Sequence, residues 1–413
     1  MQKKAAEEKG FVPFERNKKY KAGDKVYVYN RDKAIILAVI GKKSPAEGVH
    51  LAAAHIDSPR MDLKPNPLYE SDELAFFKTH YYGGIKKYQW TTIPLALHGV
   101  VMRKDGAKVD VCVGEEEGDP QFCVTDLLPH LAGGQMSKSA STVITGELLN
   151  ILIGSSAFDD EDISDSVKLN IMNIINEKYG FIEDDFLSAE LELVPAFKAR
   201  DVGFDRSMIG SYGHDDRVCA YAELKAILDT KKPEYTSVAI LTDKEETGSD
   251  GNTGLNSNYL KYFLCDLGEC FGVDGRQVMS NSVCLSADVN AAYDPNFADV
   301  YEKNNSSRLN YGAVITKYTG ARGKGGTSDA SAEFMYRVRN LLDTHNVLWQ
   351  TGELGKVDIG GGGTVALYIA NLDIDVVDLG VPVLSMHAPW EIVSKIDAYM
   401  TYRAVYEFFA NEL

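Results

Sequence analysis

The sequence has no apolar run of the ~18 residues that a membrane-spanning helix requires. Its N-terminal stretch, MQKKAAEEKGFVPFE, is charged and lacks the apolar core that is typical of a secretory signal. Tandem repeats and long low-complexity linkers are also absent. These absences argue against a membrane-embedded, secreted or repetitive protein, and we expect a globular protein in the cytoplasm.

Positive charge is scarce in this chain. It has 43 Lys and Arg residues against 60 Asp and Glu residues, which gives a formal net charge of -17. Nucleic acids and anionic membrane surfaces repel such a protein, so we expect neither as a partner. Hydrophobic residues make up 45% of the 413 residues, which is enough for a large core and two domains.

Paired cysteines are missing as well. None of the six cysteines forms a CxxC pair, and several lie in apolar runs such as SVCLSADV. In a chain of this length, such a pattern is typical of reduced, buried thiols in a cytosolic protein. We therefore expect neither a disulfide framework nor a structural zinc site built from cysteines.

What the sequence does contain is an alternation of apolar strands with amphipathic helices. Residues 25–30, 33–41 and 49–57 are strand-like, and the alternation returns after about residue 204. It predicts an α/β fold with a mostly parallel or mixed sheet and helices on both faces. Residues 92–206 interrupt the pattern. We therefore predict a discontinuous α/β domain, residues 1–91 and 207–413, with a smaller β-rich domain inserted at 92–206.

Local patterns predict further elements. Residues 95–114 resemble a hairpin that turns at residues 104–106. Helices are expected near residues 145–153 and 164–179, followed by an alternating strand at 186–197. The C-terminal segment, WEIVSKIDAYMTYRAVYEFFANEL, has the periodicity of one long amphipathic helix.

Two histidines and several acidic residues follow apolar runs, where open α/β sheets bind ligands. His55 ends the run VHLAAAH, and Asp57 faces the same way, so that it could fix the tautomer of the imidazole. Asp215 precedes a helix, which favours a capping role, although one carboxylate of the HDD pair could also bridge two metals. Glu245 and Glu246 follow a strand, and one could bind a metal while the other holds a proton.

Asp288 and His387 end two further apolar runs. Each of these residues alone is an ordinary strand-end side chain. Together they supply two imidazoles and several carboxylates at the strand ends of one predicted sheet. This set without paired cysteines suits a catalytic zinc site, and a two-metal site needs about five protein ligands.

The order HxD, DD, EE, D, H resembles that of the aspartyl aminopeptidase family of zinc metallopeptidases (metallopeptidase family 18), and more distantly that of the tetrahedral aminopeptidases. The matching segments, which span His55 to His387, are HIDSPR, YGG, HDDRVCA, DKEETGS, SADVNAAYDPNF and LGVPVLSMH. The glycine-rich segment VDIGGGGTVALYI is closer to a bacterial branch of that family.

The resemblance implies two zinc ions per chain, although cobalt or manganese would fit the same ligands. It implies one metal on His55 and Asp288, the other on Glu246 and His387, and a bridging Asp215. It further implies that Glu245 is the general base and that Asp57 orients His55.

The resemblance also implies assembly. Family members form dodecamers through the inserted dimerisation domain, and a His of a PHLA segment reaches a neighbouring subunit's site. His130 is the matching residue here, and a surface His at a helix start is the alternative. Lys317, Arg322 and Lys324 are candidates for selecting an acidic substrate residue.

The implied activity is that of an aminopeptidase that removes N-terminal residues from peptides, through a hydroxide bridging two zinc ions. An acidic N-terminal residue is one possible preference. Two alternatives remain open at this point: another di-zinc hydrolase, such as a carboxypeptidase or N-acyl deacylase, and a non-catalytic metal-binding cage protein.

Overall fold

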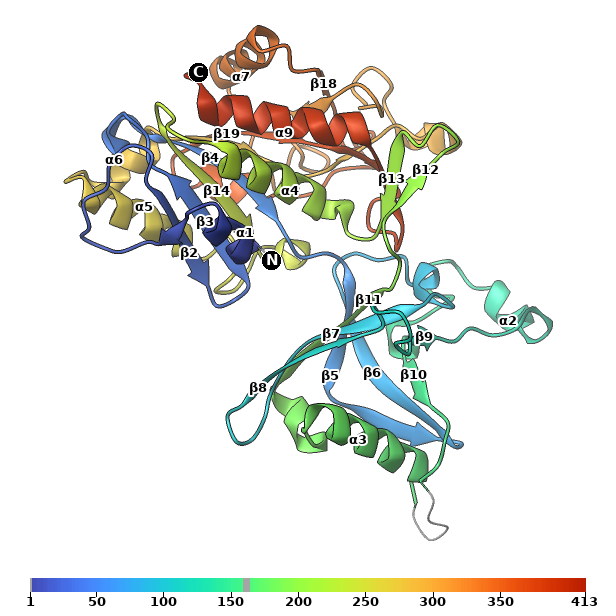
Figure 1. Ribbon diagram of the computed structural model, residues 1–413. Coiled ribbons are helices and arrows are strands. Elements are labelled where there is room, and N and C mark those ends of the chain that lie inside the picture. Colours follow the sequence, from blue (N-terminus) through green and yellow to red (C-terminus); the bar gives the residue numbers. More distant parts are fainter. Residues whose placement is uncertain (1, 159–163) are drawn as a thin grey trace. The chain divides into compact units, whose positions relative to one another are not determined.

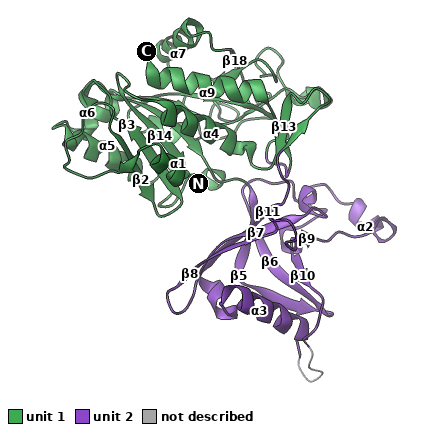
Figure 2. Ribbon diagram, in the orientation of Figure 1, with its two compact units in different colours: residues 1–58, 200–386, 390–413 green, residues 59–199, 387–389 purple. Residues whose placement is uncertain are grey.

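The computed structural model describes residues 2–158 and 164–413, and its elements are labelled in Figure 1. The chain divides into two compact units, coloured separately in Figure 2. The first unit comprises residues 1–58, 200–386 and 390–413, and the second comprises residues 59–199 and 387–389. Each unit has its own sheets and is described by itself.

The first unit is built on a mixed sheet of nine of the described strands, in the order β1-β2-β3-β14-β4-β15-β19-β17-β18. The four central strands β14, β4, β15 and β19 are parallel to one another. The bounds are β1 (Val12–Pro13), β2 (Lys25–Asn30), β3 (Ala34–Val39), β14 (Thr236–Thr242), β4 (Val49–His55), β15 (Val283–Ser286), β19 (Asp375–Gly380), β17 (Ala313–Thr316) and β18 (Trp349–Thr351).

Helices cover both faces of this sheet because the central strands are apolar on both sides. Every residue of β4 is buried, with Ala52 and Ala54 in one core cluster and Leu51 and Ala53 in the other. Helices α1 (Gln2–Glu8), α4 (His214–Asp229), α7 (Ala332–Thr344) and α9 (Lys395–Ala410) pack on the first face, where α4 and α9 lie side by side (Figure 1). Helices α5 (Tyr259–Cys270), α6 (Gly275–Ser280) and α8 (Ala366–Ala370) pack on the second.

A smaller sheet also belongs to the first unit. Its five described strands have the order β12-β13-β21-β20-β16. Their bounds are β12 (Arg200–Val202), β13 (Met208–Ser211), β21 (Glu391–Ser394), β20 (Pro382–Leu384) and β16 (Asn290–Ala291). This sheet leads the chain from β13 into α4 and from β21 into α9.

The second unit contains an antiparallel sheet of seven described strands, in the order β8-β7-β11-β5-β6-β10-β9. Their bounds are β8 (Lys108–Val113), β7 (Leu95–Met102), β11 (Ala189–Pro195), β5 (Arg60–Ser71), β6 (Leu74–Tyr82), β10 (Ile151–Gly154) and β9 (Cys123–Val124). Helices α2 (Gly133–Met136) and α3 (Ser166–Tyr179) accompany it.

The predicted fold class is confirmed: the first unit has a mixed sheet with helices on both faces, and the second unit is smaller and rich in β-strands. The second unit begins at Pro59, whereas the sequence analysis placed the boundary at residue 92. The reason is that β5 and β6 pair with β11 and β10, which the alternation of apolar runs did not reveal. A dimerisation role for this unit stays a prediction.

Two predicted helices are wrong in part. Residues 145–153 form a short 3-10 turn, Gly146–Leu148, and then strand β10, whose Ile151 and Leu152 pair with β6. The C-terminal segment begins as strand β21 because Ile392 and Val393 pair with β13, and the helix starts only at Lys395. Tertiary pairing decided the structure in both places.

The six cysteines lie in the described residues, and all of them are free thiols. Cys219 and Cys284 are buried, whereas Cys112 is exposed. Among the described helices, none combines the length and the apolar character that a membrane crossing would need. A cytoplasmic location stays a prediction.

One buried histidine gives this core a pH dependence. His50, on β4, stacks between Tyr235 and Phe408, with ring centroids 4.5 and 4.8 Å away. Its Nδ1 lies 2.8 Å from the carbonyl oxygen of Phe408, so Nδ1 donates the proton of the neutral ring. Burial lowers the pKa of His50 from its ordinary value of 6.5 to about 4.

We expect His50→Gln to flatten the pH dependence of stability between pH 6.5 and 4. In that window His50 is protonated in the unfolded chain but stays neutral in the folded chain, so the free energy of unfolding falls as pH falls. Between pH 6.5 and pH 5 the effect is about 2 kcal/mol, at roughly 1.4 kcal/mol per pH unit. Denaturant unfolding at pH 7 and pH 5 measures it. Equal slopes for the parental chain and a folded His50→Gln chain would contradict this role of His50.

Candidate metal centre

The ends of three neighbouring parallel strands position most of the candidate ligands. Strands β14, β4 and β15 lie next to one another, so their carboxyl ends meet at one edge of the sheet. His55 is the last residue of β4 and pairs with Thr242, the last residue of β14. Glu245 and Asp288 follow shortly after β14 and β15.

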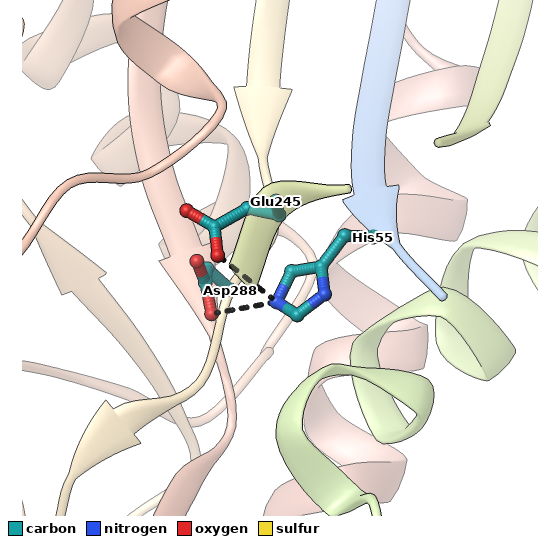
Figure 3. Close-up of side chains that lie close together, drawn as sticks. All are labelled: His55, Glu245 and Asp288. Carbon is teal, nitrogen blue, oxygen red and sulfur yellow. Dashed lines mark ion pairs between the residues drawn. The ribbon is translucent and has the colours of Figure 1, made fainter. Parts of the chain in front are cut away.

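His55 stands at the centre of the acidic residues. Its Nε2 lies 3.1 Å from Oδ1 of Asp215, 3.8 Å from Oε2 of Glu245 and 3.9 Å from Oδ1 of Asp288. Figure 3 shows the carboxylates of Glu245 and Asp288 directed at this nitrogen. The His55 side chain is only 1% exposed, so these contacts form in the interior of the first unit.

Within the described residues, the potential ligand atoms form two groups of three. One contains His55, Glu245 and Asp288, and the other contains His55, Asp215 and Glu246. In each group the atoms lie within 4.8 Å of one another. The structure therefore brings together four of the five predicted ligands and the predicted base, and His55 belongs to both groups.

Asp57 holds the His55 ring in one orientation. Nδ1 of His55 lies 2.9 Å from the carbonyl oxygen of Asp57 and 3.3 Å from its carboxylate. Because a carbonyl oxygen only accepts, Nδ1 carries the proton of the neutral ring, and Nε2 turns its lone pair toward the acidic residues. This is the tautomer that a metal on Nε2 requires.

Asp57 has a second contact that the sequence pattern did not indicate. Its Oδ1 accepts the amide of Glu245 and its Oδ2 accepts the amide of Glu246, each at 3.2 Å. One buried carboxylate therefore holds both the His55 ring and the turn that carries the paired glutamates. Only strand order brings Asp57 to this turn, so the sequence carried no signal for it.

The adjacent residues Asp215 and Asp216 contact different parts of His55. They follow Gly213, which is in the left-handed region at φ 74 and starts α4 without a side-chain cap. Asp215 faces Nε2 of His55, whereas Oδ2 of Asp216 accepts the backbone amide of His55 at 3.3 Å. The peptide bond between them is cis. Asp216 thus supports the end of β4, and neither residue acts as the ordinary N-cap.

Electrostatics favour a cation here. Burial raises the pKa of Asp288 well above its ordinary range, and the charges of Asp216, Asp215 and Glu245 raise it further. Burial lowers the pKa of His55, but its hydrogen bonds to Asp215 and Asp57 outweigh this and place it well above 6.5. The imidazole offers a nitrogen donor and the carboxylates around it offer oxygen donors, and no thiolate is among them. This donor set fits a catalytic zinc ion, whose charge would offset the repulsion.

The second unit holds the remaining predicted residues. Nδ1 of His387 lies 2.7 Å from the carbonyl oxygen of Gly84, which joins the YGG and LSMH segments. This contact selects the same ring tautomer as in His55. His130 is exposed in a 3-10 turn, Pro129–Leu131.

The expectation that all ligands follow strands of one sheet is wrong. Asp215 follows β13 and His387 follows β20, and both strands belong to the five-stranded sheet. His387 as a fifth ligand stays a prediction.

Two of the three candidate residues for substrate selection, Lys317 and Lys324, already have partners. Lys317 forms an ion pair with Asp329, and Nζ of Lys324 lies 2.7 Å from the same carboxylate. Lys324 also lies over the Tyr318 ring, 3.8 Å from its centroid. A substrate carboxylate would therefore compete with Asp329 for these lysines.

The chain is similar to known zinc metalloproteases. The family model "Aminopeptidase I zinc metalloprotease (M18)" matches residues 1–409. The chain is 52% identical over 416 residues to a probable M18 family aminopeptidase 1 of Clostridium acetobutylicum, covering 99% of this chain and 90% of the relative. The corresponding protein of Thermotoga maritima is 45% identical over 414 residues, covering 97% and 89%.

Solved structures show the same likeness. The crystal structure of an M18 family aminopeptidase from Thermotoga maritima superposes with a TM-score of 0.95 at 44% identity, covering 100% of this chain and 91% of that one. The structure of the S. cerevisiae mApe1 dodecamer has a TM-score of 0.79 at 21% identity, covering 99% and 91%. The latter likeness concerns the fold alone.

We expect the parental chain to bind zinc and His55→Ala to weaken that binding, because His55 belongs to both groups of potential ligand atoms. Loss of an outer-shell partner costs about 10- to 100-fold in metal affinity, so loss of this ligand should cost more than about 100-fold. Metal analysis after dialysis and zinc titration against a competing chelator measure this. His98→Ala, which removes a ring paired with Glu115 in the second unit, should bind zinc like the parent. Parental zinc affinity in His55→Ala would show that the metal lies elsewhere.

Proposed function

We propose a mechanism from the premise that this chain belongs to the aminopeptidase I zinc metalloprotease family (M18) and is a peptidase of that family. The proposal is that two zinc ions per chain serve the release of N-terminal residues from peptides. The observation that carries it is the pair of ligand groups that share His55, with two adjacent glutamates directed to different groups.

The proposed ligands are His55 and Asp288 for one ion, Glu246 and His387 for the other, and Asp215 as the bridge. The occurrence of Asp288 and Glu246 in different ligand groups and the fixed tautomers of both histidines support this assignment. Zinc bound by these residues would lower the pKa of a shared water and polarise the scissile carbonyl group. The substrate's free α-amine would be recognised beside the same acidic residues.

Glu245 is the proposed general base. Its side chain is 17% exposed, more than those of Asp215 and His55, so its carboxylate stays accessible to a water. Asp57 accepts the backbone amide of Glu245, and this contact fixes the backbone from which the Glu245 side chain extends. From that position Glu245 would take a proton from the attacking water and later deliver it to the leaving amine.

We expect Glu245→Gln to lose about 100- to 10,000-fold in kcat while it keeps two zinc ions per chain, because an amide cannot accept the proton. Steady-state assays on aminoacyl substrates together with metal analysis measure both quantities. The matched variant Glu246→Gln should instead lose zinc, because Glu246 is a proposed ligand. Parental turnover by a folded Glu245→Gln chain would refute the assignment.

We extend the proposal to substrates with an acidic N-terminal residue. The support is the pair of lysines Lys317 and Lys324, which both hold the Asp329 carboxylate; Arg322 is a further candidate in the same segment. An acidic substrate side chain would displace Asp329. The same aminoacyl panel, run on the parental chain, tests this: Asp and Glu substrates should be hydrolysed fastest, and an equal rate on Leu substrates would argue against it.

We also propose a homododecamer in which His130 completes the site of a neighbouring subunit. Exposed apolar side chains lie next to His130 in the sequence, including Leu128 at 48% and Leu131 at 67%. Exposed apolar patches of this kind mark association surfaces. The S. cerevisiae mApe1 dodecamer shares the fold. His130 would donate a hydrogen bond to the oxyanion that forms during hydrolysis.

His130→Ala should lower kcat by about 100- to 1,000-fold, because it removes one hydrogen-bond donor to the oxyanion. The mass of the assembly in solution should not change, because the exposed ring contributes no packing within the chain. Assemblies co-expressed from His130→Ala and Glu245→Gln chains should regain turnover that neither has alone, since each supplies what the other lacks. Sedimentation and kinetics test both statements. If the mixture stays as inactive as its parts, His130 does not act across subunits.

A further inference from the structure

Two buried side chains hold the peptide groups on either side of Asp215. The carboxylate of Glu391 accepts the Asp215 amide, with 3.0 Å between Oε2 and N. The hydroxyl group of Ser58 donates to the Asp215 carbonyl oxygen, with 2.7 Å between the two oxygens. Glu391 and Ser58 are each 1% exposed, and all three residues belong to the first unit.

The fold brings these residues together from three distant segments. Ser58 lies three residues beyond His55, in the HIDS segment. Glu391 opens β21, where it pairs with Ser211, the last residue of β13. The chain passes from Ser211 into the turn that carries Asp215. The pairing of β21 with β13 therefore places the Glu391 carboxylate next to that turn.

The Asp215 amide needs such a partner. The first amides of a helix have no acceptor within the helix, and the backbone of Asp215 is not helical, with φ -79 and ψ 105. A buried amide without an acceptor is costly, so the Glu391 carboxylate stabilises this irregular turn. Because both adjoining peptide groups are held, the direction of the Asp215 side chain is determined as well.

We propose that Glu391 is a positioning residue for Asp215 and that Ser58 is its counterpart on the carbonyl side. The inference rests on the proposed function, in which Asp215 bridges two zinc ions. A bridging carboxylate must meet both ions at once, so a small rotation of its Cα–Cβ bond weakens both sites. Glu391 therefore governs the binding of both ions although it is not itself a ligand.

Three variants with different expected effects on zinc affinity test this. Glu391→Gln keeps an oxygen that can accept the amide, and its zinc affinity should fall by less than about tenfold. Glu391→Ala removes the acceptor, and its affinity for both ions should fall by about 10- to 100-fold, as for other outer-shell residues. Ser58→Ala removes one hydrogen bond with little change of volume and should lose about three- to tenfold. Zinc titration against a competing chelator, on chains whose folding circular dichroism has verified, gives all three values.

Asp397 provides a matched control in the same unit. Its carboxylate is buried and accepts the amides of Asn310 and Gly312, each at 2.7 Å. Like Glu391, Asp397 is a buried carboxylate that accepts backbone amides, but the amides belong to a different turn. Asp397→Ala should lower the melting temperature of the metal-free protein and leave zinc affinity unchanged. A merely structural Glu391 would behave in the same way.

The outcomes separate this inference from the proposed function. If the parental chain fails to bind two zinc ions, the proposed function fails first. If the parent binds both, a folded Glu391→Ala chain with parental affinity for both ions overturns the positioning role. Should Glu391→Ala fail to fold, Ser58→Ala decides: reduced zinc affinity supports the inference, and parental affinity overturns it.

Discussion

The parallel pairing of β14, β4 and β15 is the constraint on which the rest of the site depends. It aligns the carboxyl ends of three strands, so that His55, Glu245 and Asp288 meet at one edge of the sheet. The apolar residues of these strands are buried against helices on both faces and hold that edge in place. The acidic residues can be held close together because a large core stabilises the strands that carry them.

This arrangement has an electrostatic cost. Asp216 is buried and Asp288 is largely buried beside other carboxylates, and this burial raises the pKa of each well above its ordinary range. A bound cation would offset the repulsion within such a cluster. This is the physical reason for interpreting the cluster as a metal centre. Membership of the M18 zinc metalloprotease family agrees with this reading.

Backbone contacts give the site its precision. Asp57 holds the His55 ring and the amides of Glu245 and Glu246, and Glu391 holds the amide of Asp215. These carboxylates act on the main chain next to the reactive side chains. They explain why acidic residues outnumber the metal ligands in the matching segments, since some of them orient the others.

The sequence by itself determined the fold class and the set of chemical groups, because apolar periodicity and motif order are local properties of the chain. It did not determine that 145–153 ends in a strand, since pairing with β6 decided this. Nor could it show that Asp57 bonds both glutamate amides or that Glu391 holds Asp215, residues separated by 188 and 176 positions. Only the tertiary structure decided those contacts, because strand order sets which distant residues meet.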